Sequence, residues 1–428
     1  MAVESSFYRK KMNVLLVCVL AVWTVGCSTA AKKQESTIIQ PSGSLPVTTP
    51  WDLAALSVAP KFDWADERTG IRSLFYESVP FHGKPTRVFA YYATPGTLAG
   101  DTSKDKNLPG IVLVHGGGGK AFSEWAELWA KRGYAAIAMD LAGCGPDGER
   151  LVDGGPDQSD KTKFGAIDLP VTEQWTYHAV SNVILAHSLI RSLEEVNPSR
   201  TAITGISWGG YLTCIVAGLD NRFQAAVPVY GCGFLHDNSV WLDRLNNKMT
   251  PEQRDKWVRL WDPSMYVGSA EMPMLLVNGG KDFAYPPDSY AKTYSLVKGT
   301  KNIRFTPELP HGHIFDRPME IEIFIEDILK SGTPLPKIVS LKIAEEEIRA
   351  KIKSKTKLIG AHLCYTTDDL SCNPKDRTWN TLPAQVMGKR VTVQPPPSDT
   401  TIWFINVVDE RKAVVSSELI FPGRLSSR

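Results

Sequence analysis

The sequence predicts an α/β fold, a doubly wound and mostly parallel sheet, followed by a small all-β sandwich at the C-terminus. Short apolar runs alternate with helical stretches between about residues 109 and 310, as in sheets whose strands are joined by crossover helices. These runs are apolar throughout, which is typical of strands buried on both faces. Beyond residue 336 the segments instead alternate apolar and polar residues and are separated by turns, which is the pattern of a sandwich.

The length and composition allow several globular parts. The chain has 428 residues, of which 43% are apolar and 22% are charged, and this is enough for two or three domains with a sizeable core. We expect four consecutive segments, which are a lipoprotein-type signal peptide at residues 1–27, a tether at 28–50, an α/β domain at 51–335 and the sandwich at 336–428. The tether is assigned because residues 28–50 are rich in Ser, Thr, Gln and Pro.

The first residues have the composition of an export signal. Three basic residues, Arg9 to Lys11, precede the apolar stretch Met12–Val25, which is too short for a spanning helix. The sequence Thr24–Cys27 resembles a bacterial lipobox, in which Cys27 would carry the lipid and become the mature N-terminus. We therefore expect an exported lipoprotein on a membrane surface, periplasmic or extracellular, and secretion without lipid is the alternative.

The net charge argues against large polyanionic partners. The formal charge of the whole chain is +2, and removal of residues 1–26 takes away three basic side chains and one acidic side chain, which leaves a neutral protein. A neutral surface gives no electrostatic attraction to nucleic acid or to an anionic membrane. We expect no nucleic-acid partner, and contact with a membrane only through the lipid anchor.

The elements of the α/β domain follow from local patterns. An antiparallel hairpin opens the domain, and further strands then alternate with helices. The segment 142–170 is rich in Gly and Asp and lacks periodicity, so we place it at the rim of the functional site. The expected strands are 71–79, 87–93, 109–114, 134–139, 200–204, 225–229, 272–277 and 303–307, and the expected helices are 121–132, 171–193 and 211–218. Four side chains on these helices are expected to be packing residues, and they are Trp125, Trp129, His178 and His187.

A serine lies in a glycine-flanked turn between a strand and a helix. The sequence Gly205–Gly210 reads Gly-Ile-Ser-Trp-Gly-Gly, and a G-x-S-x-G motif between strand and helix is typical of a nucleophile elbow. Small neighbours let the strand and the helix approach, while the strained turn presents the Ser207 hydroxyl to a cleft. The backbone N–H of Trp208 would then lie where an oxyanion forms. The alternative is a chance match of the motif in a glycine-rich loop.

A second glycine-rich stretch follows the strand at 109–114. It reads His115-Gly116-Gly117-Gly118-Gly119 and matches the HGGG type of oxyanion loop. Glycines let backbone N–H groups crowd against a developing oxyanion, and Gly117 and Gly118 are the candidates. We expect His115 to brace the loop. A phosphate cradle is disfavoured because Lys120 is followed by Ala121 instead of Ser or Thr.

An acidic residue and a histidine follow later strands in the order that completes a triad. Asp282 comes after the strand at 272–277, and His313 after the strand at 303–307. In such sheets functional groups gather beyond the carboxyl ends of the strands, and the order Ser…Asp…His is the one expected of an α/β-hydrolase. The expected mechanism is nucleophilic attack by Ser207, with His313 as general base and Asp282 orienting the imidazole.

The choice of histidine rests on the local backbone, because His311 lies two residues before His313. An extended segment separates such residues by about 7 Å, so only one of them can reach both partners. Gly312 frees the chain before His313, whereas Pro310 stiffens the chain before His311. Two histidines without further ligands at suitable spacing do not make a zinc site, and we expect neither a metal nor a cofactor.

Residues from about 70 to 330 resemble the α/β-hydrolases related to bacterial acetyl xylan esterases, dienelactone hydrolases and the catalytic domain of prolyl oligopeptidases. The resemblance is carried by residues 114–119, 205–211, 278–283 and 311–313. It implies an esterase for small acyl groups, acetyl above all, on carbohydrate. The resemblance lacks the N-terminal propeller of the prolyl oligopeptidases, because about 50 residues after the tether are too few for repeated blades, and this favours an ester over a peptide as substrate.

The substrate is expected to be an acylated carbohydrate or another small ester. The segment 234–271 is predicted to cap the site, and its tryptophans suit stacking on sugar faces. We assign substrate binding to Trp241 and Trp261, with Trp257 in the same cap, and to Tyr285 just beyond Asp282. Two alternatives remain, a serine peptidase of prolyl oligopeptidase type that cleaves short peptides, and a non-catalytic surface protein that binds carbohydrate.

The C-terminal segment resembles the immunoglobulin- or fibronectin-like modules that follow some secreted hydrolases. Strands are expected at 357–365, 390–393, 400–407 and 413–421, whereas 343–352 fits a helix or a strand. Trp379 and Trp403 are expected in the core. Cys364 and Cys372 flank a turn, and an exported protein would permit a bridge between them.

Overall fold

The computed structural model of the protein describes residues 49–66 and 70–422. The described residues belong to one compact unit. The predicted signal peptide, Cys27 and nearly all of the predicted tether lie outside the described residues. Within the described part of the chain, no helix combines the length and apolar character needed to cross a membrane.

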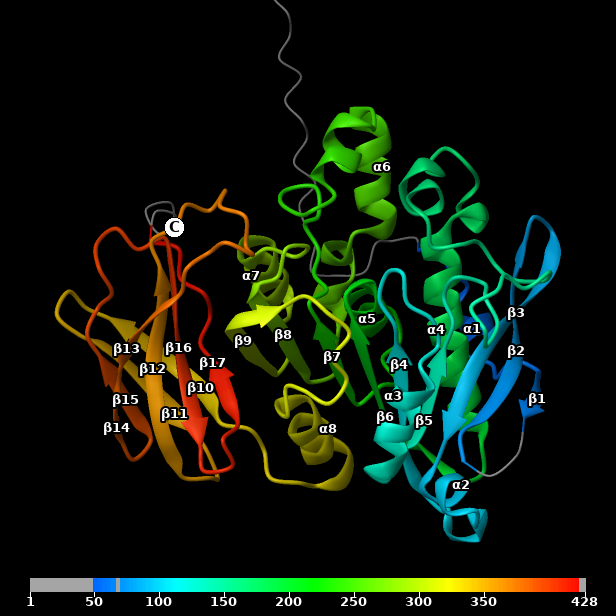
Figure 1. The fold of residues 1–428 in the computed structure, drawn as a ribbon, viewed down its shortest axis with the longest axis horizontal. Helices are drawn as coiled ribbons and strands as arrows, with labels where there is room; N and C mark the ends of the chain where they lie inside the picture. The colour runs from blue at the N-terminus through cyan, green and yellow to red at the C-terminus, as the bar shows by residue number, and fades with distance from the viewer. Residues whose placement is uncertain (1–48, 67–69, 423–428) are drawn as a thin grey trace, which may run out of the picture. The chain divides into compact units, whose positions relative to one another are not determined.

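A large sheet organises the described residues, and its central strands are parallel (Figure 1). The strand order is β1-β2-β3-β5-β4-β6-β7-β8-β9, after which β17, β16, β12 and β13 follow. Strands β5 to β9 in this order run parallel to one another, and β1 to β3 are antiparallel. The bounds are β1 Phe62–Asp66, β2 Arg72–Phe81, β3 Lys84–Ala93, β4 Leu108–Val114, β5 Ala135–Met139, β6 Val196–Ile206, β7 Ala225–Val229, β8 Met274–Lys281 and β9 Lys301–Pro310. This is the predicted doubly wound sheet.

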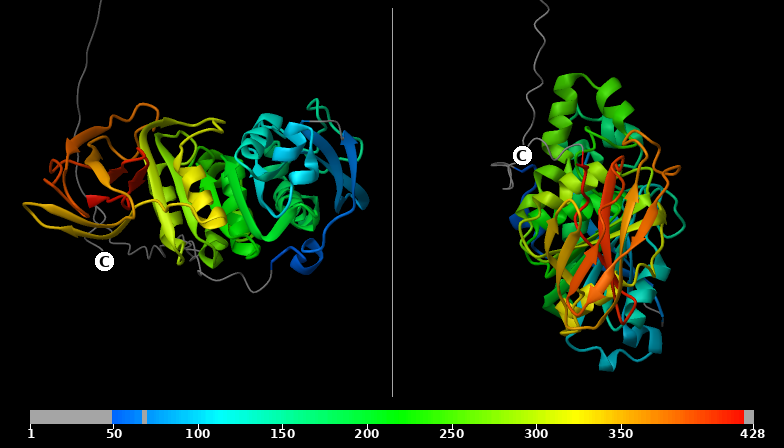
Figure 2. Two further views of the ribbon diagram at one scale, coloured as in Figure 1. Left: turned by 90° about the horizontal axis from the view of Figure 1, so that it is seen from below. Right: turned by 90° about the vertical axis from the view of Figure 1, so that its left-hand side faces the viewer.

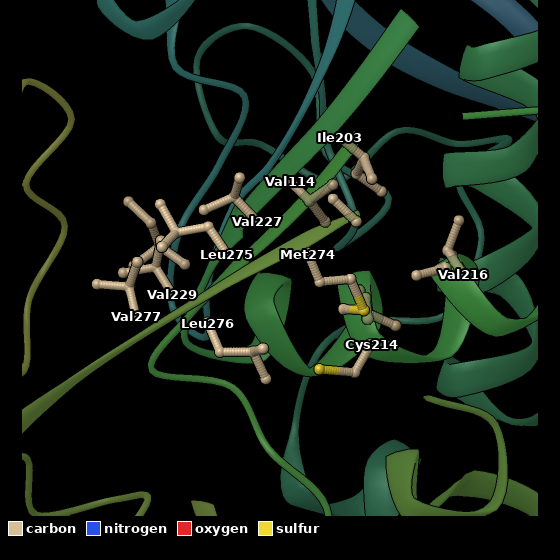
Figure 3. Close-up of a cluster of buried hydrophobic side chains, with 14 of the residues drawn as sticks. Val114, Ile203, Cys214, Val216, Val227, Val229, Met274, Leu275, Leu276 and Val277 are labelled. Carbon is tan, nitrogen blue, oxygen red and sulfur yellow. The ribbon is translucent and has the colours of Figure 1, made fainter. Parts of the chain in front are cut away.

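Helices cover both faces of this sheet, as crossover connections require. On one face α4 packs beside α5, and Figure 3 shows apolar side chains of α5, β6, β7 and β8 meeting in the core. On the other face Arg132, which follows α3, forms an ion pair of 2.9 Å with Glu322 of α8. The helices are α1 Leu53–Leu56, α2 Pro95–Ala99, α3 Ser123–Lys131, α4 Trp175–Ser192, α5 Trp208–Leu219, α6 Pro251–Trp261, α7 Pro287–Leu296 and α8 Glu320–Lys330.

The predicted elements are found close to their expected bounds. Helix α4 begins at Trp175 rather than at Val171, because a single 3₁₀ turn, Val171–Glu173, follows Pro170. Helices α7 and α8 were not predicted. The packing roles of Trp125, Trp129, His178 and His187 are confirmed, since each side chain is almost fully buried.

The C-terminal β region, residues 337–422, contains two antiparallel sheets, as a sandwich would. One sheet has the order β10-β11-β15-β14. The ambiguous segment 343–352 ends in the strand β11, whose residues are alternately buried and exposed. The bounds are β10 Lys337–Ile343, β11 Ile348–Lys353, β12 Leu358–Thr366, β13 Asn380–Pro383, β14 Gln385–Met387, β15 Arg390–Val393, β16 Ile402–Asp409 and β17 Val414–Ser416.

The other C-terminal sheet is continuous with the α/β sheet. Strand β17 pairs antiparallel with β9 at Ser416 and Ile303 (Figure 2). The Ser416 hydroxyl also accepts a hydrogen bond of 2.8 Å from the backbone N–H of Phe305. Because β9 leads directly to the predicted histidine loop, the C-terminal β region is joined to the strand that positions the functional site.

The predicted disulfide is wrong, because all cysteines in the described residues are free thiols. Cys364 lies on β12 with its side chain buried, and its sulfur accepts a hydrogen bond from Asn406 at 3.7 Å. Cys372 lies in the loop after β12 and contacts the carbonyl of Asn373. Trp403 is buried as predicted, while Trp379 is partly exposed and packs against Phe305 and Phe404.

Candidate active site

Ser207 sits in a strained turn at the carboxyl end of β6. Its φ and ψ are 60° and −119°, a conformation that a non-glycine residue adopts at a cost. The turn is possible because its neighbours are glycines. A Cβ on Gly205 would lie 2.2 Å from the carbonyl oxygen of Gly209, and one on Gly209 would lie 1.9 Å from the carbonyl oxygen of Val114. The local geometry is therefore that of the predicted elbow.

His311 connects Ser207 to Asp282. Its Nε2 lies 2.8 Å from the Ser207 hydroxyl oxygen, and its Nδ1 lies 2.9 Å from a carboxylate oxygen of Asp282. This network assigns the ring proton to Nδ1 and leaves Nε2 to accept from the serine. Asp282 is fully buried, and its second oxygen accepts the backbone N–H groups of Ala284 and Tyr285 at 2.8 and 2.9 Å. These bonds fix the carboxylate that orients the imidazole.

The prediction of His313 as the general base is wrong, and sheet register explains why. Strands β8 and β9 are parallel neighbours, and Lys281 is paired with Pro310. Asp282 directly follows the end of β8 and His311 directly follows the end of β9, so the two residues leave the sheet side by side. His313 is two residues further along the loop and reaches neither Ser207 nor Asp282 in the structure.

His313 instead supports the glycine loop. Its Nε2 accepts the backbone N–H of Gly116 at 3.1 Å, and its ring lies against Phe122. Burial lowers the pKa of His313 to about 4, with a further contribution from the neighbouring His115 and His311. A neutral ring can accept through Nε2, so the low pKa is consistent with this hydrogen bond.

His115 braces the same loop, as predicted. Its Nδ1 contacts the carbonyl of Gly116 at 2.8 Å, and its Nε2 accepts the backbone N–H of Leu141 at 2.9 Å. Burial lowers its pKa to about 4, which keeps the ring neutral and both bonds intact near neutral pH. The loop is therefore held by a histidine on each side.

The two N–H candidates of the glycine loop differ in their placement. A Cβ on Gly117 would lie 2.6 Å from the indole of Trp208, so this residue stands directly beside the elbow. Gly118 has a φ of 68°, and a Cβ there would meet nothing within 4 Å. The structure thus brings Gly117 to Trp208, while Gly118 makes the turn of the loop. Trp208 itself begins α5, where the N-terminal end of the helix dipole favours negative charge.

Aromatic rings surround the imidazole of His311. The ring centroids of Tyr230, Phe283 and Tyr285 lie 4.9, 5.1 and 6.1 Å from that of His311. The sequence interpretation missed Tyr230 and Phe283 in this role. Their signal was positional, because Tyr230 directly follows β7 and Phe283 directly follows Asp282.

Of the residues assigned to substrate binding, Trp241 alone is open to solvent. It is partly exposed and packs against Trp208 and Tyr285 at 4.7 and 5.1 Å between ring centroids. The assignment of Trp261 is wrong, because its side chain is fully buried and donates to Gln174. Trp257 and Tyr285 are also fully buried, so neither can stack on a sugar. Trp257 and Trp261 therefore form the buried face with which α6 packs on the rest of the domain.

The long segment 142–170 reaches the site from the other side, as predicted. Its π-helical turn, Lys161–Gly165, places the ammonium of Lys163 4.6 Å from the ring centre of Trp208, and Phe164 packs on the same indole. In the described residues, no group of three or more His, Cys, Asp or Glu side chains is arranged to hold a metal ion.

Parts of this chain are similar to known proteins. Residues 54–263 match the acetyl xylan esterase family, and residues 238–371 match the PhoPQ-activated pathogenicity-related protein family. The uncharacterized peptidase YuxL of Bacillus subtilis is 26% identical over 232 residues, or 51% of this chain. The acetyl esterase Axe7A of Xylanibacter ruminicola is 24% identical over 230 residues, or 49% of this chain. The aligned parts cover only 32% and 50% of these two relatives.

Solved structures are similar in fold. The acetyl xylan esterase from Paenibacillus sp. R4 superposes with a TM-score of 0.52 at 22% identity, covering 67% of this chain and 97% of that one. At this level of identity the similarity concerns the fold.

Proposed function

We propose that this chain, which has the fold of the α/β-hydrolases, removes small acyl groups, acetyl above all, from carbohydrate. Its match to the acetyl xylan esterase family indicates a serine carboxylic ester hydrolase. The observation that carries the proposal is the chain of contacts from Ser207 through His311 to Asp282, with the glycine loop beside it.

The first step is attack of the Ser207 oxygen on the ester carbonyl. His311 takes the serine proton at Nε2, which already lies at hydrogen-bond distance. Asp282 holds Nδ1 and stabilises the positive charge that the imidazole then carries. The same proton passes from Nε2 to the alcohol that leaves, and the acyl group remains on Ser207 as an ester.

Negative charge develops on the carbonyl oxygen during this attack. The backbone N–H of Trp208 and that of Gly117 are the donors that we assign to it. Both groups are held before the reaction begins, the first by helix α5 and the second by the loop that His115 and His313 fix. A water molecule, activated by His311, then repeats the sequence on the acyl-enzyme.

A serine peptidase is the second candidate, and a specific finding favours it. The B. subtilis relative is described as a peptidase, and the same catalytic groups can cleave amides. A binding protein without catalysis is the third class, and the complete set of contacting groups argues against it, since binding alone needs no such set.

A panel of substrates separates these classes. We expect the purified enzyme to hydrolyse p-nitrophenyl acetate and acetylated xylo-oligosaccharides, and to cleave a prolyl p-nitroanilide at least about tenfold less efficiently in kcat/KM. The Ser207→Ala variant is the control for spontaneous hydrolysis. Efficient cleavage of the prolyl substrate beside weak ester turnover would move the assignment to a peptidase, and inactivity on all three would support a binding protein.

We also propose that the protein is exported and held on a membrane by a lipid on Cys27. The support is the basic, apolar and Gly-Cys succession of residues 9–27. Mass spectrometry of the mature protein, expressed in a bacterium with its full N-terminus, is expected to find a diacylated or triacylated Cys27 as the first residue. An unmodified N-terminus at another position would refute the anchor, and Cys27→Ser is the matched control.

A further inference from the structure

A cavity beside the candidate active site is built jointly by the α/β domain and the C-terminal β region. Its volume is about 340 Å³. The α/β side contributes Asn238 to Val240, Phe283 and Pro286, and the other side contributes the stretch Leu370–Lys375. The first group adjoins the site directly, because Val240 precedes Trp241 and Phe283 follows Asp282. Phe283, whose ring centroid lies 5.1 Å from that of His311, therefore connects the cavity to the candidate active site.

The rim loop, residues 367–379 between β12 and β13, is fixed against the end of β8. The ammonium of Lys281 donates to the carbonyl of Arg377 at 2.5 Å, and the indole N–H of Trp379 donates to the carbonyl of Gly280 at 3.4 Å. A Cβ on Gly280 would lie 2.3 Å from that indole nitrogen, so the approach requires glycine. The strand that delivers Asp282 thus also holds the rim loop.

The rim loop is also braced from within. The guanidinium of Arg377 is almost fully buried and donates to backbone carbonyls of the same loop, those of Asp368, Asp369, Leu370 and Cys372 at 3.2 to 3.5 Å. A buried cation that satisfies several carbonyls holds a loop in one shape. The rim-loop side of the cavity is therefore preorganised for ligand binding.

Lys375 on the cavity wall contacts the ring of Phe283, which in turn contacts the ring of His311. The ammonium of Lys375 lies 4.4 Å from the ring centre of Phe283, and the ring of Phe283 lies 5.1 Å from that of His311. Phe283 is 38% exposed, so part of its ring is open to solvent. Within the rim loop the carboxylates of Asp368 and Asp369 accept backbone N–H groups of Thr378 and Ser371, and Asp376 directly follows Lys375.

From this arrangement we propose that the cavity is the subsite for the carbohydrate portion of the substrate, and that Lys375 binds a carboxylate on a sugar next to the acylated one. The inference rests on the proposed esterase function and names its substrate class, an acylated oligosaccharide that carries a uronic acid. Asn238 and Ser371 on the cavity wall donate to Asp288 and Asp369, so their oxygens are the atoms that would accept from sugar hydroxyls. The amide oxygen of Asn373 accepts the backbone N–H of Lys375, so its amide nitrogen would donate to the sugar.

The test compares Lys375→Gln with Lys389→Gln, which removes the same charge from the exposed turn between β14 and β15. Steady-state kinetics are measured on p-nitrophenyl acetate, on an acetylated neutral xylo-oligosaccharide and on the same oligosaccharide bearing a uronic acid. We expect Lys375→Gln to raise KM about fivefold for the acidic substrate only, with kcat unchanged. Added salt should shrink this difference, because it screens the exposed charge. Lys389→Gln should match the wild type on all three.

Each other outcome overturns the inference. Equal KM values for Lys375→Gln and Lys389→Gln on the acidic substrate would remove Lys375 from recognition, while hydrolysis of p-nitrophenyl acetate by the wild type would leave the esterase assignment standing. An equal rise in KM for neutral and acidic oligosaccharides would exclude the carboxylate. Failure of the wild type on every ester would refute the proposed function, and the subsite with it. The same comparison can be made without turnover. Calorimetry would measure the affinity for the acidic oligosaccharide in Ser207→Ala enzymes that also carry Lys375→Gln or Lys389→Gln.

Discussion

Replacing Gly209 by Ala is expected to lower the free energy of unfolding by about 3 kcal/mol and to cut kcat/KM at least about 100-fold. The added methyl group would lie 1.9 Å from the carbonyl oxygen of Val114 and 2.7 Å from that of His115. Both are backbone atoms at the end of β4, where the glycine loop begins, so helix α5 would have to move away. That movement would separate Ser207 and Trp208 from Gly117, and the oxyanion donors would no longer converge.

This outcome runs against local propensity, which makes it informative. Alanine is the better helix former by about 1 kcal/mol, and on an unconstrained helix the substitution would stabilise the protein. Gly299→Ala is the matched control, because the nearest atom to its added Cβ lies 3.6 Å away. Chemical denaturation and ester turnover measure the two effects. A Gly209→Ala variant as stable and active as Gly299→Ala would show that the close contact between α5 and β4 is not required.

The sequence predicted the α/β sheet well because its strands are buried on both faces and its turns carry distinctive residues. The elbow and the glycine loop were recognisable because close backbone contacts admit only glycine there. Asp282 was recognisable because it follows a strand at the carboxyl edge. In each case a short stretch of sequence reflects a structural requirement at the same place in the fold, so a single sequence is enough to recognise it.

The errors arose where the outcome depends on how distant segments meet. The choice between His311 and His313 depends on the register of β8 with β9, and neither Gly312 nor Pro310 carries that information. The assignment of Trp261 failed because an amphipathic helix does not disclose whether its aromatic face meets the core or a cleft. The rim loop could not be found at all, since the contact between Lys375 and Phe283 joins residues 92 positions apart.

The central claim is that His311 is the group that activates Ser207, and single-residue kinetics test it most directly. His311→Ala is expected to lower kcat about 10⁴-fold on p-nitrophenyl acetate with the fold intact, because the described residues offer no other side-chain hydrogen bond to the serine hydroxyl. His313→Ala is expected to cost about tenfold, through a less ordered glycine loop, and His313→Gln should recover most of that loss by offering Gly116 an acceptor. If folded His313→Ala were instead the inactive enzyme and His311→Ala retained turnover, the account of this site would be contradicted.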